Sequence, residues 1–182
     1  MIRRSIRDLP ASQAAVYLDE ADIHLNPKIG PDWMNRGTQK QVPTPGQNVK
    51  RYLCGTYDAT RRRLEYVVGP RKNGSLFIDM LQKLLKVYAG YEVIHVVLDN
   101  YRIHSSKQAQ AWLAEHGRPL RLHFLPPYCP QENRIERQWL DLHANVTRNH
   151  RCQSIDELMQ QVFGWVRRRN RSRARAAAKK AA

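Results

Sequence analysis

The alternation of apolar and polar residues in the first third of the chain predicts strands. Residues 15–25 read as one strand and are followed by a Pro/Gly-rich loop, in which residues 33–39 could form a second, short strand. Residues 49–57 and 63–68 flank the turn residues Asp58, Ala59 and Thr60, a pattern typical of a β-hairpin. A meander of early strands is therefore expected.

From Leu76 onwards the spacing becomes helical, with apolar residues recurring every three or four positions until Gly90. The nearly continuous apolar run 93–98 (VIHVVL) is typical of a strand that is covered on both faces. A helix that starts at Ser105–Ser106 and stops at Gly117 is followed by a further strand at 120–125. Helices and strands thus alternate in the middle of the chain.

The last part of the chain predicts helices. One starts at Asn133 and carries Ile135, Trp139, Leu142 and Val146 on one face. Another begins with the capping-box pattern Ser154-x-x-Glu157 and runs to about Arg168. Strands in a meander followed by alternating helices and strands predict an α/β domain, a mixed sheet with helices on its faces.

The net charge of the chain indicates what kind of partner it binds. The 182 residues carry 31 Lys and Arg against 16 Asp and Glu, a net charge of +15, and eight of the positive residues lie in 167–182. No apolar stretch is long enough for a membrane span, and three cysteines without metal-type spacing favour a reduced, intracellular protein. Such a charge favours a polyanion; the tail alone is equally compatible with a solvated, disordered end and with attraction to phosphates.

Three acidic residues occupy positions where acids are costly or functional. Asp19 shares a strand face with apolar residues, where a carboxylate needs a partner or a cation, unless the position is a wet sheet edge. Asp99 ends the run 93–98, at the carboxyl end of a strand where α/β sheets gather their chemistry, or else it caps a loop. Glu136 is also a plausible capping-box partner of Asn133. As a set, these hard oxygen ligands suit Mg²⁺ or Mn²⁺ and phosphoryl chemistry.

Three blocks of sequence carry a resemblance to a known family. The segments YLDEADIHLNP (17–27), VVLDNYRIHSS (96–106) and LPPYCPQENRIERQW (125–139) resemble, in order, the three blocks of the DDE transposases of the mariner-like superfamily, in its bacterial insertion-sequence branch. Trp33, Arg36 and Gly37 resemble the short block between the first two. The resemblance spans residues 15–150, and the 36 residues between Asp99 and Glu136 are close to the spacing of that family.

The resemblance implies a ribonuclease H-like, mixed five-stranded sheet with helices on both faces. It implies that Asp19, Asp99 and Glu136 are the catalytic residues and the ligands of Mg²⁺ or Mn²⁺, two ions in all. The implied reaction is cleavage of DNA at transposon ends and transfer of the 3′-hydroxyl to target DNA, without a covalent enzyme intermediate. The candidates for DNA contacts are His104, Arg134, Arg137, Arg167, Arg168 and Arg169; for His104 the family block equally implies a supporting contact to Asp99 or to a phosphate.

The same resemblance implies an organisation and a set of partners. We expect an N-terminal extension (1–14), a catalytic domain (15–166) and a basic, disordered tail (167–182). We expect a homodimer on transposon ends and target DNA in the bacterial cytoplasm, associated with the nucleoid when bound to DNA. Family members usually carry a helix-turn-helix region ahead of the first aspartate, and only 18 residues precede Asp19 here, so a separately encoded helix-turn-helix part is a further expected partner.

Departures from the family pattern leave alternatives open. Cys129, Glu132 and Arg134 replace a serine, an apolar residue and a proline in the turn before Glu136, although the three acids remain. One alternative is a truncated, non-catalytic remnant that binds DNA. Another is a general ribonuclease H-type nuclease or resolvase, against which the Pro126–Pro127–Tyr128 block argues.

Overall fold

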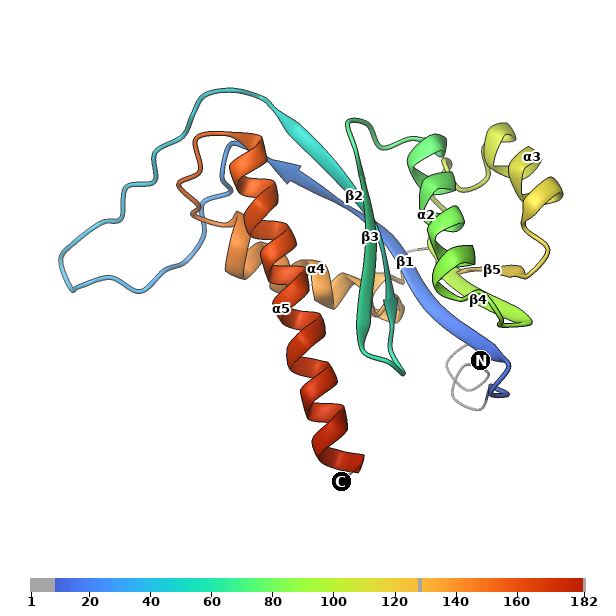
Figure 1. Ribbon diagram of the computed structural model, residues 1–182. Coiled ribbons are helices and arrows are strands. Elements are labelled where there is room, and N and C mark those ends of the chain that lie inside the picture. Colours follow the sequence, from blue (N-terminus) through green and yellow to red (C-terminus); the bar gives the residue numbers. More distant parts are fainter. Residues whose placement is uncertain (1–8, 128, 182) are drawn as a thin grey trace. The chain divides into compact units, whose positions relative to one another are not determined.

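A five-stranded mixed sheet forms the centre of the fold in the computed structural model, which describes residues 9–127 and 129–181, without the side chains of Pro130 and 172–181. The strands lie in the order β3-β2-β1-β4-β5 (Figure 1). Their bounds are β1 Gln13–His24, β2 Lys50–Asp58, β3 Arg63–Gly69, β4 Val93–Leu98 and β5 Leu120–Phe124. The predicted hairpin and the predicted strand 93–98 are confirmed.

The register of the sheet places two of the candidate acids side by side. β1 pairs with β4 in parallel, and Tyr17 lies opposite Val97. Two residues further along each chain come Asp19 and Asp99. Because the strands are parallel, both acids lie at the same end of this pairing, where the carboxyl end of β4 meets the middle of the longer β1.

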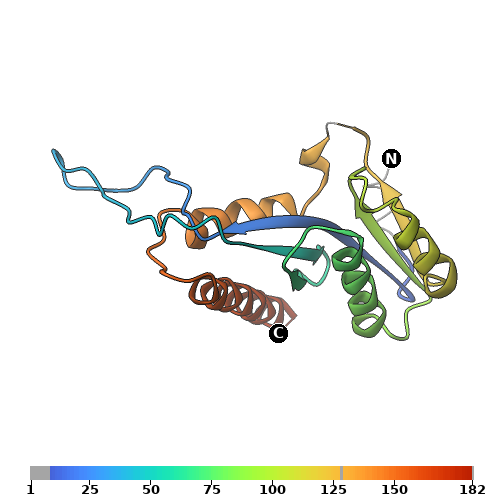
Figure 2. The ribbon, with the colours of Figure 1, turned by 90° about the horizontal axis from the view of Figure 1, so that it is seen from above.

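Two helices cover one face of the sheet. α2 (Gly74–Val87) begins at Asn73, whose side chain accepts a hydrogen bond from the Leu76 N–H, and α3 (Lys107–His116) begins at Ser106, which caps Ala109 in the same way. The two helices lie next to each other beside β4 and β5 (Figure 2). Their buried residues share one core with the side chains of β1 and β4 that point to this face, namely Ala14, Val16, Leu18, Ile94, Val96 and Leu98.

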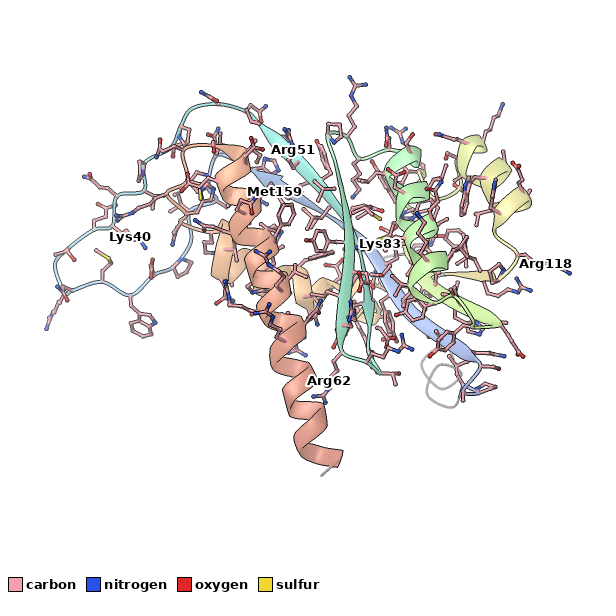
Figure 3. The ribbon with its side chains drawn as sticks, in the orientation of Figure 1. Lys40, Arg51, Arg62, Lys83, Arg118 and Met159 are labelled. Carbon is pink, nitrogen blue, oxygen red and sulfur yellow. The ribbon has the colours of Figure 1, made fainter. Side chains whose placement is uncertain are left out.

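A lysine connects α2 to the hairpin. Lys83 Nζ donates to the Tyr66 carbonyl at 2.8 Å and lies 3.1 Å from a Glu65 carboxylate oxygen of β3 (Figure 3). The labelled Arg62 marks the turn of the hairpin in the same view. The polar edge of α2 is thus attached to β3, while its apolar face enters the core.

The contacts divide the chain into two units, one formed by Met1–Ala21 and Tyr52–Glu136 and the other by Asp22–Arg51 and Arg137–Ala182. The second unit holds most of α4 (Glu136–Leu142), the π-helical turn His143–Thr147 and α5 (Ile155–Ala181). In it Asn149 bonds both the N–H and the carbonyl of Gly30, each at 3.0 Å. This pair connects the long loop after β1 to the segment before α5.

Two expectations about the second unit need correction. Residues 33–39 form no strand; they belong to the loop, and the Trp33 side chain is 98% exposed, so the apolar residues of this stretch have no sheet to pack on. The last helix does not end near Arg168: α5 continues to Ala181, so residues 167–181, expected as a disordered tail, are helical. Arginine, alanine and lysine are strong helix formers, which accounts for this extension.

No helix among the described residues is long and apolar enough to cross a membrane. Residues 1–8 of the expected N-terminal extension, Tyr128 of the Pro-Pro-Tyr turn and Ala182 lie outside the described residues.

Candidate active site

Asp19 lies on the central strand of the sheet and not at an edge. β1 has β2 on one side and β4 on the other, which rules out the wet-edge interpretation of this residue. Burial, together with the negative charges of Glu136 and Glu20, raises the pKa of Asp19 to about 8, against the opposing effects of a hydrogen bond from the Glu20 backbone and of the charge of Lys72. A carboxyl group with this pKa holds a proton at neutral pH unless a cation replaces it.

Asp99 directly follows β4 and its side chain is 53% exposed. One carboxylate oxygen accepts a hydrogen bond from the Tyr101 N–H at 3.0 Å, so the predicted loop-capping role is present. The same oxygen lies 3.2 Å from Nδ1 of His104, and this hydrogen bond holds the pKa of Asp99 below its ordinary value. Capping and charge compensation therefore act on the same carboxylate.

Glu136 is the first residue of α4, and Asn133 positions it. The Asn133 side chain is buried; its Nδ2 donates to the Leu18 carbonyl at 2.9 Å, while the Glu136 N–H bonds the Asn133 carbonyl at 3.1 Å. Asn133 thus connects the turn before Glu136 to the residue that precedes Asp19. This contact gives Asn133 a role other than that of a capping-box partner.

The three acids act on one another electrostatically. Burial and the charge of Asp99 raise the pKa of Glu136, as Glu136 in turn raises that of Asp19. Asp99 and Glu136 line the same pocket of about 250 Å³, together with Asn133. Nothing in the described part of the chain groups three His, Cys, Asp or Glu side chains closely enough to enclose an ion as they stand. Three hard oxygen donors that repel one another are nevertheless the donor set that a divalent cation would draw together.

Two residues of this region were not among the predicted site residues. Lys72, in the loop before α2, lies 3.5 Å from Glu20. Its positive charge favours the ionised form of all three acids: it opposes the rise in the pKa of Asp19 and of Glu136 and adds to the lowering of the pKa of Asp99. Glu20 is 7% exposed and points to the opposite face of β1 from Asp19, where its Oε1 accepts hydrogen bonds from His104 at 3.0 Å and from the Cys54 thiol at 3.5 Å. The sequence does carry a signal for the burial of Glu20: on a strand it shares one face with the apolar residues Val16 and Leu18.

His104 connects the buried Glu20 to the exposed Asp99. Its ring is 1% exposed; Nε2 bonds Glu20, and Nδ1 bonds both the backbone carbonyl and the carboxylate of Asp99. Burial lowers the pKa of His104, but the hydrogen bonds to Asp99 and Glu20 outweigh it and raise the pKa to about 9. As the imidazolium, His104 donates from both nitrogens. The contact of His104 with DNA stays a prediction; in the structure its ring is buried and both of its nitrogens bond residues of the chain.

The arginines proposed as DNA contacts divide into two kinds. Arg134, Arg137, Arg167 and Arg168 are exposed. Arg169 is not available in the same way: within the second unit its guanidinium bonds Gln138 at 2.7 Å and Asp141, and lies over the Trp165 ring. Its contacts give Arg169 a structural role in fastening α5 to α4.

The sequence is similar to a described family and to one curated protein. The family described as DDE superfamily endonuclease matches residues 14–159. The "insertion element IS630 uncharacterized 39 kDa protein" of Shigella sonnei is 42% identical over 161 residues, which are 88% of this chain and 47% of that protein. The chain therefore spans about half the length of this relative.

The structure is similar to solved transposases. It matches the Mos1 mariner paired-end complex with Mn with a TM-score of 0.64 at 16% identity, over 85% of this chain and 48% of that one. It matches the catalytic domain of Mos1 mariner transposase with a TM-score of 0.53 at 15% identity, over 86% of this chain and 71% of that one. At such identities the likeness concerns the fold, and it confirms the expected ribonuclease H-like sheet.

Proposed function

Because the chain belongs to the DDE superfamily endonucleases, we propose that it is the catalytic part of an insertion-sequence transposase, which cleaves DNA strands and transfers them to a target. The observation that supports the proposal is electrostatic: the charge of Glu136 raises the pKa of Asp19, and the charge of Asp99 raises that of Glu136. The three acids come from the middle of β1, the residue after β4 and the start of α4.

We propose that these three residues hold two divalent ions, Mg²⁺ or Mn²⁺. Bound there, such ions would activate water or a 3′-hydroxyl and neutralise charge on the scissile phosphate. The residues of the chain supply the rest: Asn133 holds the start of α4 next to Leu18, and His104 holds the Asp99 carboxylate. The solved Mos1 paired-end complexes with Mn and with Mg support this choice of metals.

We propose that the DNA backbone contacts the exposed arginines. Arg134 lies over the Tyr17 ring at 5.6 Å in the first unit, and Arg137, Arg167 and Arg168 are exposed in the second. Sequence-independent attraction of this kind agrees with the net charge of +15. We also propose that a homodimer of this chain holds two DNA ends in the bacterial cytoplasm. Solved Mos1 paired-end complexes support the pairing of two ends.

A second candidate function is that of a DNA-binding remnant without catalysis. The observation that favours it is that, among the described residues, no three His, Cys, Asp or Glu side chains lie close enough together to enclose an ion as they stand. Recognition of transposon ends by a separately encoded helix-turn-helix part is a further proposal. Both candidates predict salt-dependent DNA binding, so binding alone does not separate them.

The experiment that separates them is nicking of supercoiled plasmid by the purified chain, with Mg²⁺, with Mn²⁺ and with EDTA. We expect nicking that requires the metal and is lost in Asp19→Ala, Asp99→Asn and Glu136→Ala, while the affinity for DNA is unchanged. The matched control is Asp79→Asn, which removes an exposed carboxylate from α2 in the same unit and should leave nicking unchanged. Tight binding without nicking by the unchanged chain would contradict catalysis and support the remnant.

A further inference from the structure

Glu20 is a buried carboxylate that the proposed catalytic set does not use. It is next to Asp19 in sequence, but strand alternation sends its side chain to the face covered by α2 and α3. Removing a carboxylate from water is costly unless cations and hydrogen-bond donors compensate it. Here the donors are His104 Nε2 at 3.0 Å and Cys54 Sγ at 3.5 Å, with Lys72 Nζ at 3.5 Å from the other oxygen.

These contacts hold the imidazole of His104 in one orientation. One ring nitrogen is bonded to Glu20, and the ring packs against Phe77 with 4.7 Å between the centroids. With Nε2 held in this way, Nδ1 can point in one direction only, and it points to Asp99, at 3.1 Å from the carbonyl and 3.2 Å from the carboxylate. The chain Glu20–His104–Asp99 therefore runs from the core to the exposed acid.

Asp99 is the member of the catalytic set that most needs such support. It lies in a loop, and its side chain is 53% exposed, so it lacks the packing that surrounds Asp19. Its carboxylate is bonded by the backbone N–H of Tyr101 and by the ring of His104. A freely rotating carboxylate would have to lose its rotational freedom on binding an ion, which weakens the affinity.

We propose that Glu20 and His104 form a positioning pair, which orients the Asp99 carboxylate for the divalent cation through one buried hydrogen-bond chain. The inference rests on the proposed function, because it takes Asp99 to be a metal ligand. Neither residue is a catalytic residue in this scheme: Glu20 acts on Asp99 through His104, and both stay buried. The consequence is that the affinity for the cation depends on a core residue from the other face of β1.

The test is the affinity of the purified full chain for Mn²⁺ in the absence of DNA, measured by the electron paramagnetic resonance signal of free Mn²⁺. His104→Phe keeps a ring beside Phe77 but removes both N–H donors, and it leaves Glu20 with fewer partners. The double variant Glu20→Gln/His104→Phe also removes the negative charge of Glu20, so it keeps the test valid if the single variant unfolds. We expect the Kd for Mn²⁺ to rise roughly 10-fold to 100-fold in both variants.

A stability control separates positioning from general weakening of the core. Leu84→Ala removes a fully buried side chain of α2, two helical turns beyond Phe77, so it should lower stability and leave the Kd for Mn²⁺ unchanged. An unchanged Kd in the folded double variant, with normal binding by the unsubstituted chain, would overturn the positioning role alone. Failure of the unsubstituted chain to bind Mn²⁺ would overturn the proposed function and this inference together.

Discussion

Replacing Asp19 by asparagine should stabilise the metal-free protein while removing its response to metal. The pKa of this carboxyl group is about 8 in the fold and 3.8 ordinarily. At pH 7 the folded protein must therefore take up a proton that the unfolded chain does not hold, at about 1.4 kcal/mol for each pH unit above 3.8, or about 4 kcal/mol in all. Asparagine has nearly the same shape and does not ionise, so it needs no proton uptake on folding.

The expected gain is smaller than this upper value, because a buried amide also loses hydrogen bonds to water. We expect Asp19→Asn to raise the free energy of unfolding by about 2–4 kcal/mol at pH 7 in EDTA. Urea unfolding followed by far-ultraviolet circular dichroism would measure it. With Mg²⁺ in excess the unsubstituted protein should gain stability by mass action, by about 2.7 kcal/mol at 100 times its Kd, and the variant should gain little.

The pH dependence provides an independent check. A carboxyl group whose pKa is raised by folding contributes most to stability when protonated, and this contribution is lost as the pH rises from about 4 towards 8. His104, whose pKa is raised to about 9, adds stability below pH 6.5 that is lost between 6.5 and 9, but it does so in both proteins. The difference between the two proteins thus isolates Asp19, and a difference that stays constant from pH 5 to 8 would refute the reasoning.

Three further predictions follow from contacts described above. Asn133→Ala removes the hydrogen bond to the buried Leu18 carbonyl, so it should lower the free energy of unfolding in urea by about 1–3 kcal/mol and reduce nicking at saturating metal. Full nicking by this variant would contradict the role of Asn133 in placing Glu136. Phe77→Ala should cost about 3–5 kcal/mol, because a fully buried ring leaves a cavity, and a loss under 1 kcal/mol would contradict the packing. Arg167→Gln with Arg168→Gln should leave stability unchanged but reduce the slope of log affinity for DNA against log salt by about 1–2, as filter binding at several salt concentrations would show.

Much of the sheet could be predicted because burial leaves a periodic trace in the sequence. The strand at 93–98 has the predicted bounds, because apolar residues occupy nearly every position: one face enters the core, and on the other face Val97 is buried. Ser106 and Gly117 were predicted as the ends of α3 because capping is local chemistry. The position of Asp99 after β4 followed directly from these bounds.

The rest depended on contacts between residues that are far apart in sequence. His104 lies 84 residues after Glu20, and no local sequence pattern predicts the hydrogen bond between them. The position of the His104 ring is determined by the loop after β4. Arg169 could not be distinguished from its two arginine neighbours until α4 brought Asp141 and Gln138 beside it. The predicted strand at 33–39 was wrong because apolar side chains alone do not show whether a sheet edge is available to them.

The side chains of Asp19 and Glu20 point to opposite faces of the sheet, which makes β1 sensitive to the insertion or deletion of a residue. Changing either residue alters one face of the sheet and leaves the other in place. Deleting or inserting a single codon between Gln13 and Asp19 would instead exchange the two faces, because side chains alternate along a strand. Asp19 would leave the proposed ion site and Glu20 would leave His104 in the same event, so this short segment should tolerate substitutions better than single-residue insertions or deletions.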